Sequence, residues 1–169
     1  MSVAADILKN INLFVDGRGY AGQLEEFNPP VLTLKTEDFR AGGMDGPVKV
    51  TMGMEPLDCD FSLKSYSREV LALFGVVEGA VVPLVVREAL ESYDGTVTPV
   101  VHTMRGKITE LDQGTRKAGE MPLLKATLSL DYYKLQHGDR VVHEVDLVNM
   151  VRVINGNDAL AAIRGALGM

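Results

Sequence analysis

The chain has 169 residues, a net charge of −6, and a composition that is 46% hydrophobic and 24% charged. These values fit a soluble globular protein with enough residues for one sizeable core. The negative charge argues against a general nucleic-acid-binding surface, which requires clustered lysine and arginine to neutralise phosphates.

The first residues predict a short β-hairpin. Residues 2–9 fit either a short helical turn or a mobile arm. Residues 11–15 alternate like a strand, residues 16–19 (Asp-Gly-Arg-Gly) supply a turn, and residues 20–24 form the returning strand. Pro29-Pro30 then makes a stiff connector, because each proline fixes φ and lacks an amide hydrogen.

The most distinctive stretch, residues 35–54, predicts a long β-hairpin that we call the arm. Its alternating strands, residues 31–37 and 48–54, bracket a tip rich in glycine. The second strand places four apolar residues on one side: Val48, Val50, Met52 and Met54. A hairpin this long reaches beyond its own core, so we expect it to contact another molecule.

The middle of the chain predicts strands around one short helix. Residues 57–63 alternate, with Cys59, Phe61 and Leu63 on one face. Residues 65–75 predict a helix that Ser65 or Ser67 caps and Gly75 ends. Residues 81–92 are ambiguous, and Pro83 favours a strand because it would disrupt a helix interior.

Two further strands are predicted over residues 96–104 and 106–111, followed by an exposed loop over residues 112–121. Residues 123–135 show the clearest alternation in the chain. One face of this strand is apolar: Leu124, Ala126, Leu128, Leu130 and Tyr132. The opposite face is polar: Lys125, Thr127, Ser129 and Asp131.

The C-terminal part predicts strands over residues 141–147 and 151–154, then a helical segment over residues 157–169. Asp158 caps the helix, and Gly168 ends it. Its apolar face consists of Leu160, Ile163 and Leu167. No alternation of strand and helix, internal repeat or linker is visible. The prediction is a single domain over residues 1–169, mainly β. We expect an antiparallel β-barrel or sandwich with two short helices and a long extended hairpin arm.

Catalytic and metal-binding patterns are missing from the sequence. The histidines lack zinc-ligand spacing, so ordinary packing or surface positions are favoured for all three: His102, His137 and His143. As the single cysteine, Cys59 cannot form an intramolecular disulfide, and its apolar strand neighbours favour burial over a nucleophilic role. Asp58 and Asp60 fit a solvated acidic face better than an acid–base pair. We expect no enzyme activity, cofactor or metal.

No signal peptide or membrane helix is expected either. The opening residues lack a basic segment followed by a long apolar core. The most apolar run, residues 75–86, is interrupted by Glu78 and Pro83. It falls far short of the ~20 apolar residues that a membrane-spanning helix needs.

Several stretches together resemble the major tail tube protein of contractile-tailed bacteriophages and R-type pyocins. They are NLFVDGRGYAG near the start, KTEDFRAGGMDGPVKVTMGME in the arm, DYYKL, and VNMVRVINGNDALAAIRGALG at the end. The resemblance extends from about Asn12 to Gly168, although residues 79–119 carry no motif of their own.

The resemblance implies a non-enzymatic subunit that forms homohexameric rings, stacked into a hollow tube inside a contractile sheath. Its partners would be other copies of itself, the tail sheath protein, baseplate proteins and a tape-measure protein. In a phage, DNA would pass through the lumen without specific binding. In a pyocin or other tailocin, the tube would puncture a membrane and conduct ions. The protein would be made in the bacterial cytoplasm and reside in the virion tail tube or tailocin particle.

Two sets of residues are candidates for roles in such a tube. The arm tip would make contacts between rings and subunits through Arg40, Gly42, Gly43, Met44 and Asp45. Polar strand faces would line the lumen through Lys49, Thr51, Lys125, Thr127, Ser129 and Asp131, with plain solvated surface as the alternative. Two other functions stay open: a secretion-system tube resembling the haemolysin-coregulated protein family, and a small-ligand-binding or hydrolytic β-barrel.

Overall fold

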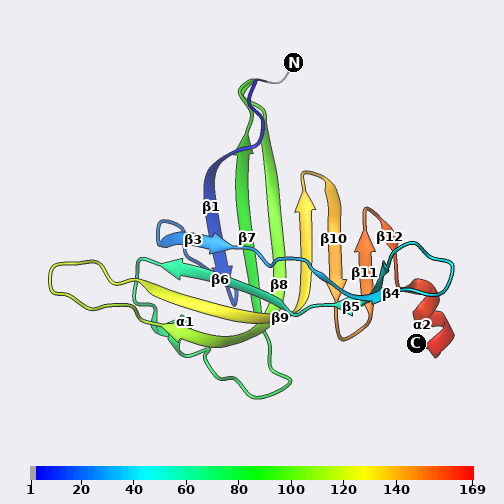
Figure 1. Ribbon diagram of the computed structural model, residues 1–169. Helices are drawn as coiled ribbons and strands as arrows, with labels where there is room; N and C mark the ends of the chain where they lie inside the picture. The colour runs from blue at the N-terminus through cyan, green and yellow to red at the C-terminus, as the bar shows by residue number, and fades with distance from the viewer. Residues whose placement is uncertain (1–2) are drawn as a thin grey trace.

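The computed structural model describes residues 3–169, and it shows two layers of antiparallel strands with a projecting hairpin (Figure 1). The strands are β1 (Ile7–Val15), β2 (Arg18–Gly19), β3 (Leu24–Asn28), β4 (Leu34–Phe39), β5 (Val48–Met54), β6 (Leu57–Leu63), β7 (Val82–Glu91), β8 (Val97–Asp112), β9 (Leu124–His137), β10 (Arg140–Asp146), β11 (Val151–Ile154) and β12 (Asn157–Asp158). The helices are α1 (Arg68–Leu71) and α2 (Ala161–Leu167). The predicted class, mainly β with two short helices, is confirmed.

The two layers share the long strands β8 and β9. The upper layer of Figure 1 follows the order β12-β11-β10-β9-β8-β7-β1-β2, whereas the lower layer adds β6 and β3 to the first half of β9. Residues Leu124–Leu130 of β9 pair with β6, and residues Tyr132–His137 pair with β10. One continuous strand therefore turns the corner between the layers.

Gly106 makes this corner possible. The pairing of β8 with β9 shifts there, because Arg105 lies opposite Tyr132 while Gly106 lies opposite Leu130. A Cβ atom on Gly106 would lie 2.1 Å from the carbonyl oxygen of Ser129, so a larger residue could not occupy this position without separating the strands. The prediction of two strands, 96–104 and 106–111, was therefore wrong: glycine bends one strand instead of ending it.

The same bulge reverses the alternation of β9. Asp131 is the extra residue, opposite neither Arg105 nor Gly106 of β8, so the side chains beyond it change faces. Tyr133, which is 3% exposed, joins the core, whereas Tyr132 is only half-buried. The prediction of an inward-facing Tyr132 was wrong for this reason, while the inward faces of Leu124 to Leu130 are confirmed.

The core lies between the two layers. Its fully buried side chains come from both, among them Leu13, Leu84, Val86 and Met104 from the upper layer and Leu57, Phe61, Leu63 and Leu128 from the lower. Val70 of α1 also contributes, because the short helix covers one end of the core. The alternating faces predicted for residues 57–63 are confirmed for Cys59, Phe61 and Leu63.

The N-terminal prediction needs two corrections. Residues from Ile7 onward form β1, which pairs with β7 along its length, where a helical turn or mobile arm was expected. The returning strand β2 is only two residues long, and Leu24 begins β3. Because β3 pairs with β6, the chain leaves its hairpin early and crosses to the other layer.

Both helices are shorter than predicted. α1 spans only Arg68–Leu71, and its cap is Ser67, whose Oγ accepts a hydrogen bond from the Val70 amide at 3.4 Å. The segment predicted as helical from residue 157 begins with strand β12, so Asp158 is a strand residue. Gly168 ends α2 in a left-handed conformation, with φ 74°, as predicted. Over residues 3–169, neither helix has the length and apolar content that crossing a membrane requires.

Cys59 offers a direct check of the core. The side chain is 2% exposed, and burial, followed by the nearby carboxylates of Asp60 and Asp58, raises the pKa of its thiol to about 12. The reactive thiolate is therefore scarce at neutral pH. We expect a thiol-specific reagent such as DTNB to leave Cys59 unmodified in the folded subunit and to react fully in denaturant. Rapid stoichiometric labelling of the native protein would contradict this burial.

Candidate functional site

The arm is a two-stranded sheet separate from the two layers, and of residues 34–54 only Met54, at its base, packs against the core. β4 and β5 pair only with each other, and Asp38 lies opposite Lys49, with a 3.1 Å ion pair between them. Within residues 3–169, no hydrogen bond links residues 34–54 to the two layers. Figure 1 shows the arm crossing in front of β10 and ending beside α2. The predicted hairpin is confirmed, beginning at Leu34.

A bulge divides the faces of the arm. Thr36 lies opposite Thr51 and Leu34 opposite Met54, so β5 carries an extra residue where Gly53 adopts φ 100°. Met54 therefore lies on the face of Thr51 and not on the face of Val50. The expectation that Met54 shares a side with Val48, Val50 and Met52 was wrong, because this glycine bulge inverts the alternation.

The other face of the arm carries an exposed apolar stripe, which we call the arm stripe and which runs beside Glu37, the residue opposite Val50. It consists of Phe39 (54% exposed), Val48 (49%), Val50 (44%) and Met52 (53%). Phe39 lies opposite Val48, so the residues form one continuous patch along the two strands. A contiguous exposed apolar patch typically marks a surface that binds another molecule.

The arm tip brings together the residues predicted to make contacts. The Met44 amide donates to the Ala41 carbonyl at 3.2 Å, and the Ala41 amide donates to the Met44 sulfur at 3.3 Å. Gly43 has φ 88°, a conformation that favours glycine. Arg40, Gly42, Gly43 and Asp45 are exposed, and Met44 is half-buried. The tip is thus a defined turn with a charged rim.

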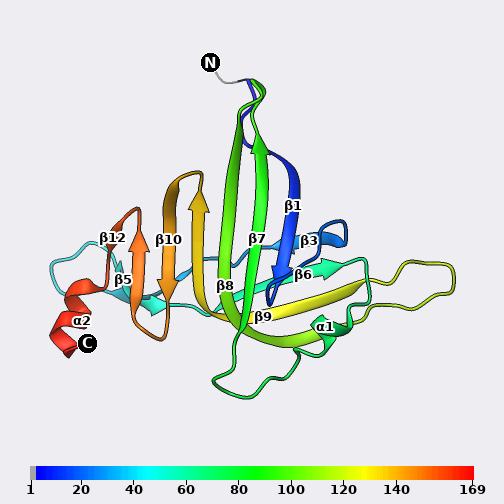
Figure 2. The same ribbon diagram turned by 180° about the vertical axis from the view of Figure 1, so that it is seen from behind.

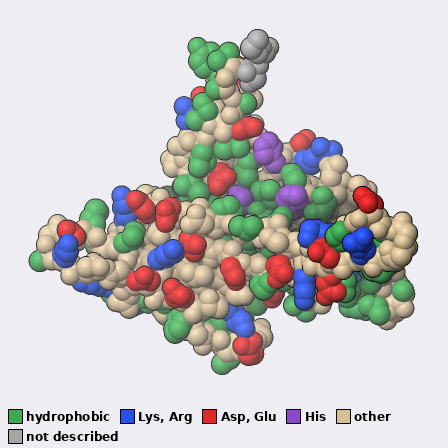
Figure 3. Space-filling view, viewed as in Figure 1, with side chains coloured by type: hydrophobic (Ala, Val, Ile, Leu, Met, Phe, Trp, Pro, Cys, Tyr) green, Lys and Arg blue, Asp and Glu red, His purple; other side chains and the backbone are tan. Residues whose placement is uncertain are grey.

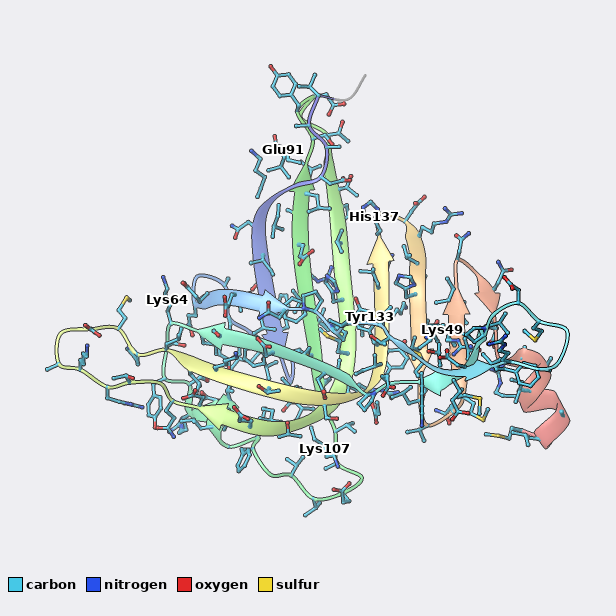
Figure 4. All side chains as sticks on the ribbon, in the orientation of Figure 1. Lys49, Lys64, Glu91, Lys107, Tyr133 and His137 are labelled. Atoms are coloured by element: carbon cyan, nitrogen blue, oxygen red, sulfur yellow. The ribbon has the colours of Figure 1, made fainter. Side chains whose placement is uncertain are left out.

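The predicted lumen residues fall into two separate groups. Lys49 and Thr51 lie on β5 of the arm, and Figure 4 places Lys49 well away from Lys107 of the lower layer. Lys125, Thr127, Ser129 and Asp131 lie on β9, where Thr127 is opposite Asp60 and Ser129 is opposite Asp58 of β6. This second group belongs to a polar face of the lower layer, on which acidic side chains gather in Figure 3.

A groove lies between the base of the arm and α2. It has a volume of 340 Å³ and is lined by Thr51, Gly53 and Met54 of the arm, the β10–β11 connection, Val151, and Leu160 and Ile163 at α2. Ile163 is 50% exposed, and α2 buries none of its residues. The sequence indicated the apolar face of the helix, but no local pattern could show that these distant segments meet.

One wall of the groove is held in an unusual conformation. Met150 adopts φ 52°, which costs a non-glycine residue roughly 1–2 kcal/mol. Arg164 of α2 donates to the Met150 carbonyl at 2.7 Å and also binds the Asp158 carboxylate. The hydrogen bond from Arg164 is the main reason that the pKa of Asp158 lies below its usual value. Arg164 therefore fixes α2, β12 and the groove wall to one another.

Asp146 shapes the same β10–β11 connection. Its Oδ1 accepts from the Asn149 amide at 3.0 Å, its Oδ2 accepts from the Asn149 side chain at 2.8 Å, and Arg105 lies 3.7 Å away. Burial raises the pKa of this carboxyl, but the hydrogen bonds from Asn149 and the Arg105 charge outweigh burial, so the pKa is lowered.

This lowered pKa predicts an acid-dependent loss of stability. The ionised form of Asp146 stabilises the fold above the unfolded-state pKa, near 3.9, and that contribution is lost as pH falls through the lower folded-state pKa. Asp146→Asn should be less stable than wild type at pH 7, and the difference should shrink as the pH falls below about 4. Urea unfolding at a series of pH values measures this. A difference that does not change with pH would contradict the assignment.

The histidines do not converge on a site. His102 is buried, its Nδ1 lies 2.9 Å from the Tyr133 hydroxyl, and its ring meets Phe27 edge-on. Figure 4 shows His137 at the far end of β9, away from Tyr133. Among residues 3–169, no three His, Cys, Asp or Glu side chains are grouped so that they could hold a metal ion.

A second projection, the 113–123 loop, extends from the opposite end of the lower layer (Figure 1). The Tyr66 hydroxyl donates to Gln113 Oε1 at 2.8 Å, and the Arg116 guanidinium lies 4.2 Å from the centre of the Tyr66 ring. Met121 is 76% exposed and Leu123 is 44% exposed. The prediction of an exposed loop is confirmed, but its anchored base and apolar end were not anticipated.

The chain is similar to known tube proteins over nearly its whole length. A family model described as phage tail tube protein FII matches residues 5–168. The tail tube protein of Escherichia phage P2 is 30% identical over 166 residues, which cover 96% of each chain. The major tail tube protein of Serratia phage KSP20 is 31% identical over 175 residues, covering 96% of this chain and 95% of that one.

The fold is also shared with solved structures. A chain in the sheath–tube complex of PVC, an extracellular contractile injection system, has a TM-score of 0.57 and 12% identity, covering 75% of this chain and 88% of that one. A chain in the sheath/tube terminator of PVC has a TM-score of 0.58 and 12% identity, covering 76% and 94%. These identities establish likeness of fold alone. The full-length sequence match shows that this chain belongs to the phage tail tube protein FII family, a structural protein of contractile phage tails rather than an enzyme.

Proposed function

We propose that this chain forms homohexameric rings that stack into the hollow tube of a contractile tail. The observation that carries the proposal is the arm: a separate two-stranded sheet with an exposed apolar stripe of Phe39, Val48, Val50 and Met52 on one face. A free subunit gains nothing by exposing such a surface to water. Burying it against another copy would supply the free energy for assembly.

Ring closure would use the two open edges of the upper layer. β2 pairs with β1 only at Phe14 and Val15, so residues 7–12 keep a free edge on that side. β11 and β12 form the opposite edge, and Figures 1 and 2 show the two edges on opposite sides of the molecule. Edge strands readily accept a partner, and a head-to-tail contact between different surfaces generates a closed ring when the rotation fits.

Stacking would use the arm. The arm stripe would pack on the next ring, with the tip residues Arg40, Gly42, Gly43, Met44 and Asp45 completing the contact. The glycines let backbone approach backbone closely. The arm has no hydrogen bond to the two layers within residues 3–169, so it can reorient to fit a neighbour.

The polar strand faces would line the lumen. The candidates are Lys125, Thr127, Ser129 and Asp131 on β9, and Lys49 and Thr51 on the arm. Six copies at −6 each would give a ring a charge of −36. On the lower layer, Asp58 and Asp60 of β6 lie opposite Ser129 and Thr127, so a wall built from this face would carry more carboxylates than lysines. Such a wall would repel DNA and let it slide through without specific binding.

We also propose partners outside and at the end of the tube. The related fold of PVC occurs in a sheath–tube complex, which supports a tail sheath around this tube as well. Baseplate and tape-measure proteins would start the tube and set its length. In a tailocin, the same lumen would conduct ions across a punctured membrane.

Gly43→Pro tests the stacking contact. Proline requires φ near −65°, whereas Gly43 has φ 88°, so the tip turn must change while the exposed position leaves the core untouched. Electron microscopy of concentrated protein, with baseplate components to initiate assembly, should show stacked tubes for wild type and rings that fail to stack for the variant. Gly46→Ala is the control, because a Cβ there meets nothing within 4 Å and Gly46 is not among the tip residues proposed to make the contact. Tubes of normal length from Gly43→Pro would remove the tip from the mechanism.

A further inference from the structure

We propose that the groove between the arm base and α2 receives the end of the 113–123 loop from the adjacent subunit of the same ring. The inserted residues would be Met121, Pro122 and Leu123. This inference rests on the proposed ring, and it names a specific contact within it that neither the arm nor the sheet edges supply.

The groove is suited to an apolar guest. Its 340 Å³ would hold roughly ten water molecules at about 30 Å³ each, held against largely apolar walls. Met54 and Met150 line it on two sides, and methionine side chains adapt readily to the shape of a partner. The hydrogen bond from Arg164 to the Met150 carbonyl fixes one wall before any partner arrives. The wall at Met150 is therefore fixed, and the groove is unfilled by its own chain.

The loop is suited to be that guest. Tyr66 anchors its base through Gln113 and Arg116, and Gly114 follows with φ 67° and its amide donating to Asp112. An anchored loop loses less conformational entropy on binding than a free one. In its returning limb, which leads into β9, Met121 is 76% exposed, next to a proline that stiffens the chain. The structure thus presents the Met121 side chain to solvent on a limb whose other end, at Leu123, lies against Gly114 at the anchored base.

The arrangement of the two features matches a ring. Both views show the loop on the side of the free β1 edge, and the arm base and α2 on the side of the β11–β12 edge (Figures 1 and 2). A head-to-tail contact that joins these edges brings the loop of one copy towards the groove of the next. The loop cannot reach the groove of its own chain, because the two lie at opposite ends of the molecule.

Paired cysteines test the contact directly. Cys59 is buried, so only the introduced cysteines would be accessible to form disulfides. The double variant Met121→Cys with Ile163→Cys, assembled into tubes and mildly oxidised, should give a covalent ladder that ends at six subunits. Met121→Cys with Tyr93→Cys is the matched control, because Tyr93 is 77% exposed at the tip of the β7–β8 hairpin. The control should give no ladder.

The outcomes separate this contact from the proposed function. Tubes without a ladder would overturn the loop contact and leave the tube intact. A ladder beyond six subunits would place the loop in an adjacent ring and overturn the contact as stated. Wild-type protein that never forms rings would overturn both.

A second variant covers the case in which the cysteine pair does not assemble. Met121→Asp should raise the concentration needed for assembly at least about tenfold, because a buried methionine contact is lost and a charge is forced into the groove. Ala118→Asp, which is exposed on the same loop, should assemble like wild type. Unchanged assembly of Met121→Asp would overturn the proposal.

Discussion

Val50→Asp should abolish tube assembly while the subunit stays folded. Val50 lies in the centre of the arm stripe and is 44% exposed, so the change removes no core contact. In the assembled tube, however, the carboxylate would be buried without a partner. Burying an unpaired polar group costs roughly 2–7 kcal/mol, and each ~1.4 kcal/mol weakens association tenfold. Sedimentation and electron microscopy should find no tubes at ten times the concentration that wild type requires.

The matched control is Thr36→Asp, which introduces the same charge on the opposite face of the same two strands. This variant should assemble, and both variants should keep the circular dichroism spectrum and melting temperature of the wild-type subunit. Tubes of wild-type length from Val50→Asp would show that the arm stripe is not buried in the assembly.

The second large effect is on folding. Gly106→Ala should destabilise the subunit by at least about 3 kcal/mol, a large share of the 5–15 kcal/mol typical of whole proteins. The new methyl group would lie 2.1 Å from the Ser129 oxygen and 2.9 Å from Leu130 Cα, so β8 and β9 must separate at the corner. Urea denaturation and the yield of soluble protein measure the loss.

Gly46→Ala on the arm provides the comparison, because a Cβ there meets nothing within 4 Å and Gly46 does not have a positive φ. It should change the free energy of unfolding by less than about 1 kcal/mol. If Gly106→Ala unfolded at the same urea concentration as this control, the close approach of the strands at the corner would be wrong.

Local patterns predicted the strands that begin and end at clear turn signals. Residues 48–54, 57–63 and 151–154 were predicted with the boundaries that the structure shows. In each case, a proline, glycine, asparagine or serine lies within two residues of both ends, so the segment needs no distant contact to define it. The arm was recognised for the same reason, and the family match now favours a tail tube over the secretion-type tube and the ligand-binding barrel.

The errors have a common physical cause, because bulges and shared strands depend on partners far away in the sequence. Gly106 resembles a strand breaker until β9 is seen packed against it. The extra residues at Asp131 and Gly53 invert the alternation, which misplaced Tyr132 and Met54. The groove beside α2 is lined by segments that lie as far apart in the chain as Thr51 and Ile163, so no local sequence pattern could predict it.

Helical reconstruction of the assembled protein by cryo-electron microscopy tests the central claim most directly. We predict rings of six subunits, with the sheet edges joined around each ring and the arm stripe of every copy buried against the next ring. A stacked tube with Phe39, Val48, Val50 and Met52 facing solvent would contradict the role of the arm. A protein that stays monomeric, even with initiating baseplate components present, would contradict the tube itself.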